Sequence, residues 1–429
     1  MSDGNTNWEQ YLTVAALTDL GMRRTNNQDN LCVSLAQNSE QWSKRGHLFI
    51  VADGMGAHAA GELASKLAVD QIPLLLGKYR DTTPAERLKR AIIEANAEIH
   101  RKGQANEEFH HMGTTCSVLT LSPEGALAAH VGDSRVYRFR NHRLEQLTFD
   151  HSLVWEMRAA GNLTNKEELS KIPKNVITRS LGPYPDVQVD LEGPFAIQPG
   201  DSYLLCSDGL TGQVSDSEIG AVLAVLSPAE AAQFLVHLAN LRGGPDNTTI
   251  VLARINAALP NTVELPKQSN PPPGNQKFLI VLAGLGAILL LVSLLLIAAK
   301  SWWAIAPAIA GLVMLLVPLF KLTSGPSGIA PQTGGVRYGK GPYTQTDCAQ
   351  SAWELVNHLK HMVQQIRDEA TARNWKLDHS QLATLLVDAD KGQQNRELRS
   401  ALRNYALAVS NLMDQLRSQP GAAGTAIDL

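Results

Sequence analysis

The chain has 429 residues, enough for two or three domains, and its 38 Lys+Arg against 41 Asp+Glu give a net charge of −3. This balance, without a dense basic patch, argues against nucleic acid as a partner. The four cysteines stand in no CxxC pair and have no histidine at zinc-ligand spacing, which predicts inert thiols rather than a zinc site. The first 30 residues contain no positive-then-apolar segment, so no cleaved export signal is expected.

Residues 1–258 mix strand and helix patterns and are expected to form one α+β domain. Apolar or alternating runs predict strands at Tyr11–Thr18, His47–Ala52, Thr115–Leu121, Leu127–Phe139, Asp186–Leu191, Ser202–Cys206 and Thr248–Ile255. Helical periodicity predicts helices at Gly61–Tyr79, Pro84–Gln104, Ser152–Ala160 and Pro228–Leu241. Strands often follow strands, and two helices come in succession, which favours antiparallel sheets over a parallel α/β sheet.

Beyond this domain the composition predicts a linker and then a pair of membrane segments. Residues 259–277 are rich in proline and poor in apolar side chains, which is typical of an exposed, semi-stiff linker. The runs Phe278 to Ala299 and Trp302 to Phe320 carry no charge, and the first would rise about 33 Å as a helix, enough to cross a hydrocarbon core of ~30 Å. We therefore predict a transmembrane hairpin at 278–321; buried core helices are the alternative, and the prolines of the second run allow it to re-enter instead of spanning.

The remaining residues predict a small C-terminal helical domain. Residues 322–345 are rich in Gly, Pro, Ser and Thr and are interpreted as a second linker, and 419–429 as a disordered tail. Between them, 346–418 contains two apolar stripes at three- and four-residue spacing. These stripes favour a helical hairpin or bundle held by helix–helix packing, which is expected either to bind a partner or to self-associate.

Aspartates recur beside glycine at the ends of apolar strands. The pairs are Asp53-Gly54, Gly132-Asp133 and Asp208-Gly209, and Asp246 directly precedes the last predicted strand. One Asp-Gly pair alone is usually a turn, but four acids at strand ends can converge at the edge of a sheet. Clustered carboxylates repel one another unless cations neutralise them, and ligation by oxygen alone points to Mg²⁺ or Mn²⁺ rather than Zn²⁺.

These acids stand within ordered motifs. The motifs are Arg24-Thr25-Asn26-Asn27-Gln28-Asp29, Val51-Ala52-Asp53-Gly54-Met55-Gly56, Met112-Gly113-Thr114-Thr115, Val131-Gly132-Asp133-Ser134-Arg135, Ser207-Asp208-Gly209-Leu210 and Gly244-Pro245-Asp246-Asn247. Over roughly residues 10–255 the set resembles the bacterial form of the metal-dependent PP2C protein serine/threonine phosphatases. The resemblance implies a sandwich of two antiparallel β-sheets flanked by helices, with metals at one edge.

The resemblance also implies a role for each matching residue. Asp53 would bridge two metal ions with the Gly54 carbonyl as a further ligand, and Asp208 and Asp246 would complete the first metal's protein ligands. Asp133, sharing Asp208, would hold a third ion, so two or three Mn²⁺ or Mg²⁺ ions and no organic cofactor are expected. Arg24 would bind the substrate phosphate.

Two positions depart from the family pattern. Gln28 stands where the family often has Glu; with Asp29 it is expected to act on the metals from behind the ligands, and to tune metal affinity. Met55 stands where some members have a histidine proposed as general acid, so that role is not assigned. His58 and His151 are nearby in sequence, and the interpretation that they are structural is preferred for both.

The function implied is hydrolysis of phosphoserine and phosphothreonine on proteins by a metal-activated bridging water, opposing a Ser/Thr kinase in signalling. The expected location is the cell membrane, multi-pass, with the catalytic domain in the cytoplasm, where phosphoproteins are made. The alternatives are a phosphatase-like binding module without turnover, a phosphatase directed at sigma-factor regulators, and a membrane scaffold built around the helical domain.

Overall fold

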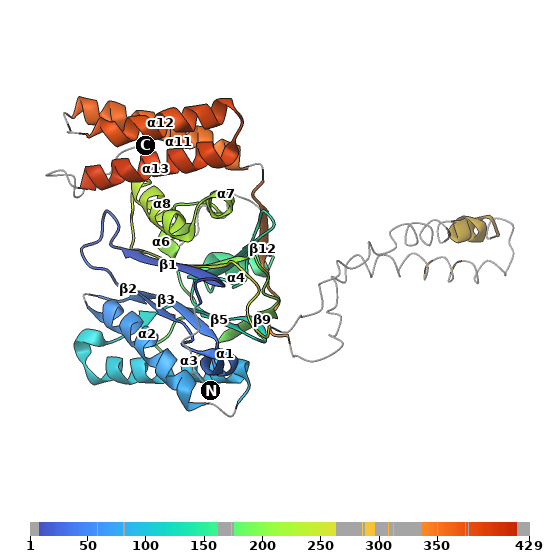
Figure 1. The fold of residues 1–429 in the computed structure, drawn as a ribbon. Coiled ribbons are helices and arrows are strands. Elements are labelled where there is room, and N and C mark those ends of the chain that lie inside the picture. Colours follow the sequence, from blue (N-terminus) through green and yellow to red (C-terminus); the bar gives the residue numbers. More distant parts are fainter. Residues whose placement is uncertain are drawn as a thin grey trace. The chain divides into compact units, whose positions relative to one another are not determined.

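A computed structural model describes residues 8–57, 59–79, 82–161, 173, 176–262, 285, 288–296, 308, 312, 337–349, 351–373, 375 and 377–417. The chain divides into two compact units. One combines Met1–Val263 with Tyr338–Leu429, and the other is Glu264–Arg337. The first unit holds every strand and helix named below (Figure 1).

Two antiparallel sheets form the body of the first unit. One sheet has the order β1 (Leu12–Asp19), β11 (Thr248–Ile255), β10 (Ser202–Cys206), β7 (Arg135–Arg140), β8 (Arg143–Gln146) and β12 (Thr344–Asp347). The other has the order β2 (Asp29–Ser34), β3 (His47–Met55), β5 (Cys116–Ser122), β6 (Gly125–Val131) and β9 (Asp190–Phe195), with the short β4 (Gly113–Thr114) paired to β3. The predicted α+β sandwich of two antiparallel sheets is confirmed.

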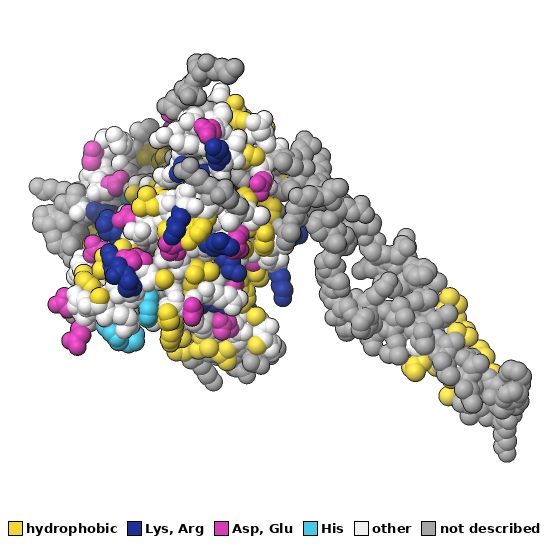
Figure 2. Space-filling view, turned by 90° about the horizontal axis from the view of Figure 1, so that it is seen from below, with side chains coloured by type: hydrophobic (Ala, Val, Ile, Leu, Met, Phe, Trp, Pro, Cys, Tyr) yellow, Lys and Arg dark blue, Asp and Glu magenta, His cyan; other side chains and the backbone are white. Residues whose placement is uncertain are grey.

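Strand β3 illustrates why the sheets are covered on both faces. Its residues Leu48 to Ala52 are all apolar and fully buried, unlike a strand with one face in water. Phe49 and Val51 point into the core between the two sheets. Leu48, Ile50 and Ala52 alternate with them and pack against α2 (Ala60–Lys78) and α3 (Pro84–Ala105) on the outer face. From the side of these helices, Lys/Arg and Asp/Glu side chains are interspersed over the described surface (Figure 2).

The outer face of the other sheet is covered by two layers of helices. Helices α6 (Asp208–Thr211), α7 (Asp216–Val225) and α8 (Pro228–Leu241) lie next to the sheet. Ser215 with Glu218, and Ser227 with Glu230, form capping boxes that begin α7 and α8. Over them pack α11 (Ser351–Ala372), α12 (His379–Gln394) and α13 (Leu398–Arg417), and one hydrophobic core runs continuously from the sheet to these three helices (Figure 1).

Several local expectations differ from the structure. The single predicted strand Leu127–Phe139 is two strands, β6 and β7, because Gly132 turns the chain with a φ of +113°. Strands β2, β8 and β12 and helix α7 have no counterpart among the predicted elements. Small elements α1 (Ser39–Lys44), η1 (Glu107–Phe109) and α4 (Leu153–Ala159) complete the described chain, and α4 matches a predicted helix.

The predicted transmembrane hairpin is wrong. Among the described residues, no helix combines the length and the apolar character needed to cross a membrane. The assignment to the cell membrane as a multi-pass protein is withdrawn with it. Most of 278–321 lies outside the described residues.

Other expectations also fall largely outside the described residues. These are the linker from 263 to 277, the linker from 322 to 336 and the tail 419–429. The described end of the second predicted linker, 337–345, lies against the sheets: the Tyr343 hydroxyl and the Gly341 N–H both donate to the Glu192 carboxylate.

Candidate active site

Five aspartates from separate parts of the chain meet at one edge of the sandwich. Asp53 lies near the end of β3, and the antiparallel register places Asp29, the first residue of β2, directly opposite it. Asp133 lies in the turn between β6 and β7, Asp208 begins α6 directly after β10, and Asp246 lies in the loop between α8 and β11. The strands therefore bring together side chains that are far apart in the sequence.

The electrostatics of these carboxyl groups show that they lie close together. Burial raises the pKa of Asp53 well above its usual range, and the charges of Asp29, Asp208, Asp133 and Asp246 raise it further. Burial likewise raises the pKa of Asp29 to about 7, with hydrogen bonds from Ser207 and Thr249 opposing and the charges of Asp208 and Asp246 adding to the rise.

The pKa values of Asp133 and Asp208 are also raised. Burial and the neighbouring charge of Asp208 raise the pKa of Asp133 to about 7. Burial and the charge of Asp246 raise the pKa of Asp208, whose side chain is within hydrogen-bonding reach of Asp53. A low-dielectric site with several carboxylates disfavours negative charge, and a divalent cation is the natural means of balancing it.

The donor set fits such a cation. Among the described residues, Asp29, Asp133 and Asp208 each have one buried carboxylate oxygen that receives no hydrogen bond. Buried polar atoms in native proteins are nearly always satisfied, and these three oxygens are therefore available as ligands for a cation. All the available donors are oxygens, which suits Mn²⁺ or Mg²⁺.

The described part of the chain contains no group of three or more His, Cys, Asp or Glu side chains already arranged to hold a metal ion. The Asp53 and Asp208 side chains nevertheless lie within hydrogen-bonding reach of each other, and the backbone around Asp53 is held by the contacts described below.

Two threonines hold the backbone of Asp53. The Asp53 N–H donates to Thr115 Oγ1 over 2.9 Å, and the Asp53 carbonyl accepts from Thr114 Oγ1 over 3.0 Å and from the Thr115 N–H over 2.8 Å. Thr115 Oγ1 is also hydrogen-bonded to Ser134 Oγ, 2.7 Å away, beside Asp133. These supporting roles were not predicted, although the Met112-Gly113-Thr114-Thr115 motif was the signal that could have revealed them.

Gly54 and Gln28 are packed together. A Cβ at position 54 would lie 2.1 Å from the Gly61 carbonyl oxygen and 2.5 Å from that of Gln28, so only glycine fits there. The Gln28 backbone carbonyl accepts from the Gly54 N–H over 3.1 Å. The Gln28 side chain donates from Nε2 to the Gly56 carbonyl over 3.2 Å. The predicted site residue Gln28 thus contacts the segment that carries Asp53 and Gly54.

His151 and His130 both hold Gly132, the neighbour of Asp133. The Gly132 N–H donates to His151 Nδ1 over 3.0 Å, and its carbonyl accepts from the His151 N–H and lies 2.7 Å from His130 Nε2. The other ring nitrogen of His151 contacts Asp190 at 3.0 Å and Arg179 at 3.1 Å. With both nitrogens engaged inside the protein, His151 has a structural position, whereas His58 lies outside the described residues.

Arg24 lies beside these aspartates, at the solvent-exposed side of the site. Its guanidinium donates to Asp246 over 2.7 Å, and 49% of its side chain is exposed. The loop that carries it is held from behind by Asn247, whose side-chain amide donates to the carbonyls of Leu20 and Asn26. Arg24 and the five aspartates, all predicted from the sequence as site residues, therefore lie together.

Known proteins share this fold and these motifs. The family model of protein phosphatase 2C matches residues 23–242, just over half of the chain. Protein phosphatase PhpP of Streptococcus pneumoniae is 39% identical over 251 residues, which cover 57% of this chain and 98% of that protein. Serine/threonine phosphatase stp of Listeria monocytogenes is 37% identical over 244 residues, covering 55% and 92% of the two chains.

A solved structure is similar over the same region. The serine/threonine phosphatase of S. agalactiae is 36% identical and matches with a TM-score of 0.51, covering 57% of this chain and 100% of that one. Sequence, fold and the converging aspartates lead to the same conclusion: this chain belongs to the protein phosphatase 2C family and is a protein serine/threonine phosphatase.

Proposed function

We propose that this phosphatase hydrolyses phosphoserine and phosphothreonine in proteins with Mn²⁺ or Mg²⁺ held by Asp53, the Gly54 carbonyl, Asp133, Asp208 and Asp246. The observation that carries the proposal is the convergence of these buried carboxylates at one edge of the sandwich, where burial and four neighbouring carboxylates raise the pKa of Asp53. A site that resists negative charge so strongly is suited to bind divalent cations. Bound ions would supply an activated water and offset charge on the phosphate oxygens.

Asp29 and Gln28 are next to the proposed metal ligands Asp53 and Gly54 and are proposed to support them. Ser207 donates to one oxygen of the Asp29 carboxylate over 2.7 Å, which fixes its orientation beside Asp208. The Gln28 backbone carbonyl accepts from the Gly54 N–H, and the Gln28 side chain donates to the Gly56 carbonyl, which fixes the direction of these peptide groups. Such supporting contacts orient metal ligands and tune their affinity.

Arg24 is proposed to bind the substrate phosphate. Its guanidinium can bind two phosphate oxygens at once, and about half of its side chain is open to solvent. In the described structure it is paired with Asp246, so binding of phosphate requires it to change partners. A cation held by Asp246 would weaken the attraction between the Asp246 carboxylate and the Arg24 guanidinium. Metal binding would thereby make Arg24 available to bind phosphate.

The substrates are proposed to be proteins phosphorylated by a Ser/Thr kinase, which this enzyme opposes. The motif around Arg24 and Asp29, together with Met112-Gly113-Thr114-Thr115, favours this class over phosphatases directed at sigma-factor regulators. Turnover of phosphothreonine peptides and of a phosphorylated sigma-factor regulator, compared under the same conditions, distinguishes the two classes.

The test uses the full chain and the variants Asp53→Asn and Asp208→Asn. Asp70→Asn is the matched control, because Asp70 is an exposed acid on α2 whose described ion pair is with Lys66. With Mn²⁺, we expect the two site variants to lose about a hundredfold or more of p-nitrophenyl phosphate and phosphopeptide turnover, and the control to keep it. Calorimetry should show weakened Mn²⁺ binding in the site variants alone. Full activity of the parent in EDTA would exclude the proposal.

A further inference from the structure

The C-terminal helices pack against the phosphatase domain, chiefly through contacts between α13 and α8. Helix α13 packs against α8, and Tyr405, Val409 and Leu412 share a core with Phe234 and other residues of that helix. The two helices run in the same direction, because their polar contacts follow the same order along both. Arg403 pairs with Glu230 over 2.6 Å near the start of α8, and Asp414 lies 3.4 Å from His237 nearer its end.

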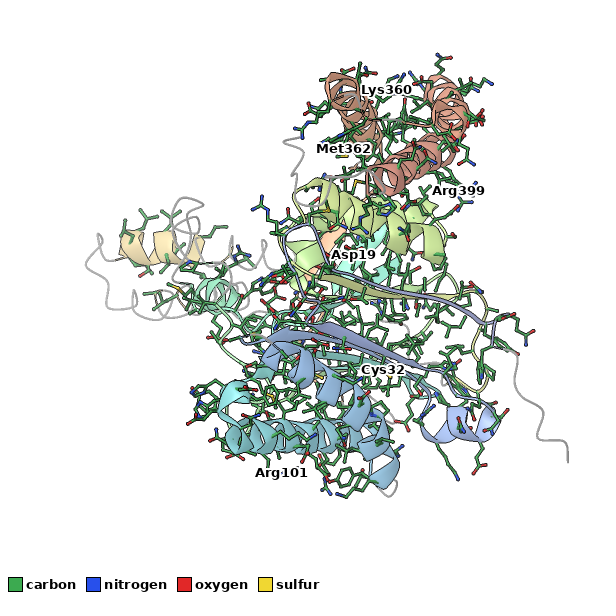
Figure 3. All side chains as sticks on the ribbon, turned by 90° about the vertical axis from the view of Figure 1, so that its left-hand side faces the viewer. Asp19, Cys32, Arg101, Lys360, Met362 and Arg399 are labelled. Carbon is green, nitrogen blue, oxygen red and sulfur yellow. The ribbon has the colours of Figure 1, made fainter. Side chains whose placement is uncertain are left out.

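The last residue of α13 reaches beyond α8 to the end of β1. Arg417 donates from both terminal nitrogens to the two carboxylate oxygens of Asp19, over 2.7 and 2.8 Å. The Asp19 side chain is only 14% exposed and that of Arg417 is 35% exposed, so the carboxylate of this two-bond pair is the part shielded from water. Figure 3 shows Asp19 between the sheets and the C-terminal helices.

Asp19 joins the two loops that carry Arg24 and Asp246. One of its carboxylate oxygens also accepts from the Gly21 N–H over 2.9 Å, at the start of the loop to Arg24. The same oxygen accepts from the Asn240 side chain over 3.0 Å, at the end of α8, where the loop to Asp246 begins. The Arg417 guanidinium therefore pairs with a carboxylate that contacts the start of both loops.

The two loops contact each other directly. The Met22 N–H donates to the Gly244 carbonyl over 2.8 Å. A Cβ at Gly21, which has a φ of +81°, would lie 2.3 Å from the Asp246 carbonyl oxygen, and one at Gly244 would lie 2.6 Å from Asn240 Oδ1. A shift of Asp19 or Asn240 is consequently passed on to Asp246 and to its partner Arg24.

We propose that Arg417 is a positioning residue for the phosphatase reaction, which holds Asp19 and through it the loops of Arg24 and Asp246. The C-terminal helical domain thereby supports the active site of its own chain. This inference rests on the proposed roles of Arg24 and Asp246. Arg417 lies outside residues 23–242, the region matched by the family model, so the contact is supplied by the part of this chain beyond that region.

The test compares Arg417→Ala, Arg417→Lys and Arg403→Ala in the full chain. Arg403→Ala is the matched control, because it removes an ion pair between the same two helices at the end away from the site. The measurements are hydrogen exchange of residues 20–28 and 242–247 without metal, the Mn²⁺ dissociation constant by calorimetry, and kcat and KM for a phosphothreonine peptide. Thermal unfolding verifies that each variant is folded.

We expect Arg417→Ala to speed exchange in both loops, to weaken Mn²⁺ binding by about threefold or more, and to raise KM more than it lowers kcat. Arg417→Lys should restore part of each effect, and Arg403→Ala should leave all three at the parent values. Unchanged loop exchange in Arg417→Ala, or equal changes in Arg403→Ala, would overturn the inference. Failure of the proposed function would give a different result, because the parent protein itself would bind no Mn²⁺. The hydrogen-exchange measurement would still test whether Arg417 holds the two loops.

Discussion

Arg24 and Asp246 are bound to each other by a hydrogen bond of 2.7 Å, although 222 residues separate them in the sequence. One is the proposed phosphate-binding residue and the other a proposed metal ligand. Each side chain holds the other while neither ligand is present, so the charge of the guanidinium is balanced at the mouth of the site. A cation held by Asp246 would compete with the guanidinium for this carboxylate and would leave Arg24 available to bind phosphate.

Removing the guanidinium should affect substrate binding and metal binding in opposite directions. We expect Arg24→Ala to lower kcat/KM for a phosphothreonine peptide by at least about tenfold, chiefly through KM, because a charge-assisted contact to phosphate is lost. Mn²⁺ should bind the variant at least as tightly, since Asp246 loses a competing cation. Arg23→Ala, a change at the exposed neighbouring arginine, is the control. Equal kcat/KM for Arg24→Ala and the parent would contradict the role assigned to Arg24.

Gln28 allows a test of how charge in the site sets metal affinity. We expect Gln28→Glu to tighten Mn²⁺ binding by about fivefold and to lower the unfolding temperature of the metal-free protein, because another carboxylate is added beside a group whose charge is already disfavoured. The variant also loses the donor to the Gly56 carbonyl. Calorimetric titration with Mn²⁺ and thermal unfolding in EDTA measure the two effects. An affinity that stays the same or weakens would show that Gln28 does not influence the metals through charge.

Thr115 is expected to support both the fold and the metal site. Thr115→Val preserves the shape of the side chain but leaves the buried Asp53 N–H and Ser134 hydroxyl without their partner, which should cost about 1–3 kcal/mol of unfolding free energy. Mn²⁺ affinity should fall as well, because Asp53 loses a contact that orients it.

Thr120→Val is the matched control for this change. Thr120 is also buried, lies on the adjoining strand β5, and donates to the Leu127 carbonyl over 3.3 Å away from the site residues. Denaturant unfolding and Mn²⁺ calorimetry of both variants separate general stability from support of the site. A loss of Mn²⁺ affinity as large in Thr120→Val would argue against a specific role for Thr115.

Glu218 should make the unfolding free energy of the protein depend on pH in the acidic range. Burial alone would raise its pKa, but hydrogen bonds from Arg242 and Ser215 outweigh that effect and lower the pKa from 4.5 to about 2. Since the folded-state pKa is depressed, the stabilisation is fully present above pH 4.5 and is lost as the pH falls towards 2. Its size at neutral pH is on the order of 3 kcal/mol, for a carboxylate whose side chain is 16% exposed.

We therefore expect Glu218→Gln to be less stable than the parent at pH 7 and the difference to shrink steadily below about pH 4.5. Unfolding free energies of both proteins, measured from pH 7 down to the lowest pH at which both remain folded, provide the comparison. A difference that is independent of pH would mean that Glu218 acts through its shape alone.

The sequence predicted strand β3, which carries Asp53, but neither β2, which carries Asp29, nor β12. Strand β3 is an uninterrupted apolar run that ends in Asp53-Gly54, and both features are local. Strand β12, Thr344–Asp347, is polar throughout and is a strand only because it pairs with β8. The apolar run from Phe278 to Ala299 led to the prediction of a membrane hairpin, which is wrong because no helix among the described residues is long and apolar enough to cross a membrane.

The amino-acid sequence by itself determined the chemical identity of the site: which acids are present, beside which glycines, and in what order along the chain. These features belong to short contiguous motifs, so they can be recognised without knowing how the chain folds. Tertiary structure alone decided that Asp29 faces Asp53, that Thr115 holds the backbone of Asp53, and that Arg417 reaches Asp19 across 398 residues of sequence. Such contacts depend on the register of strands and on the packing of distant helices, which are set by the burial of many side chains at once and by no single local pattern.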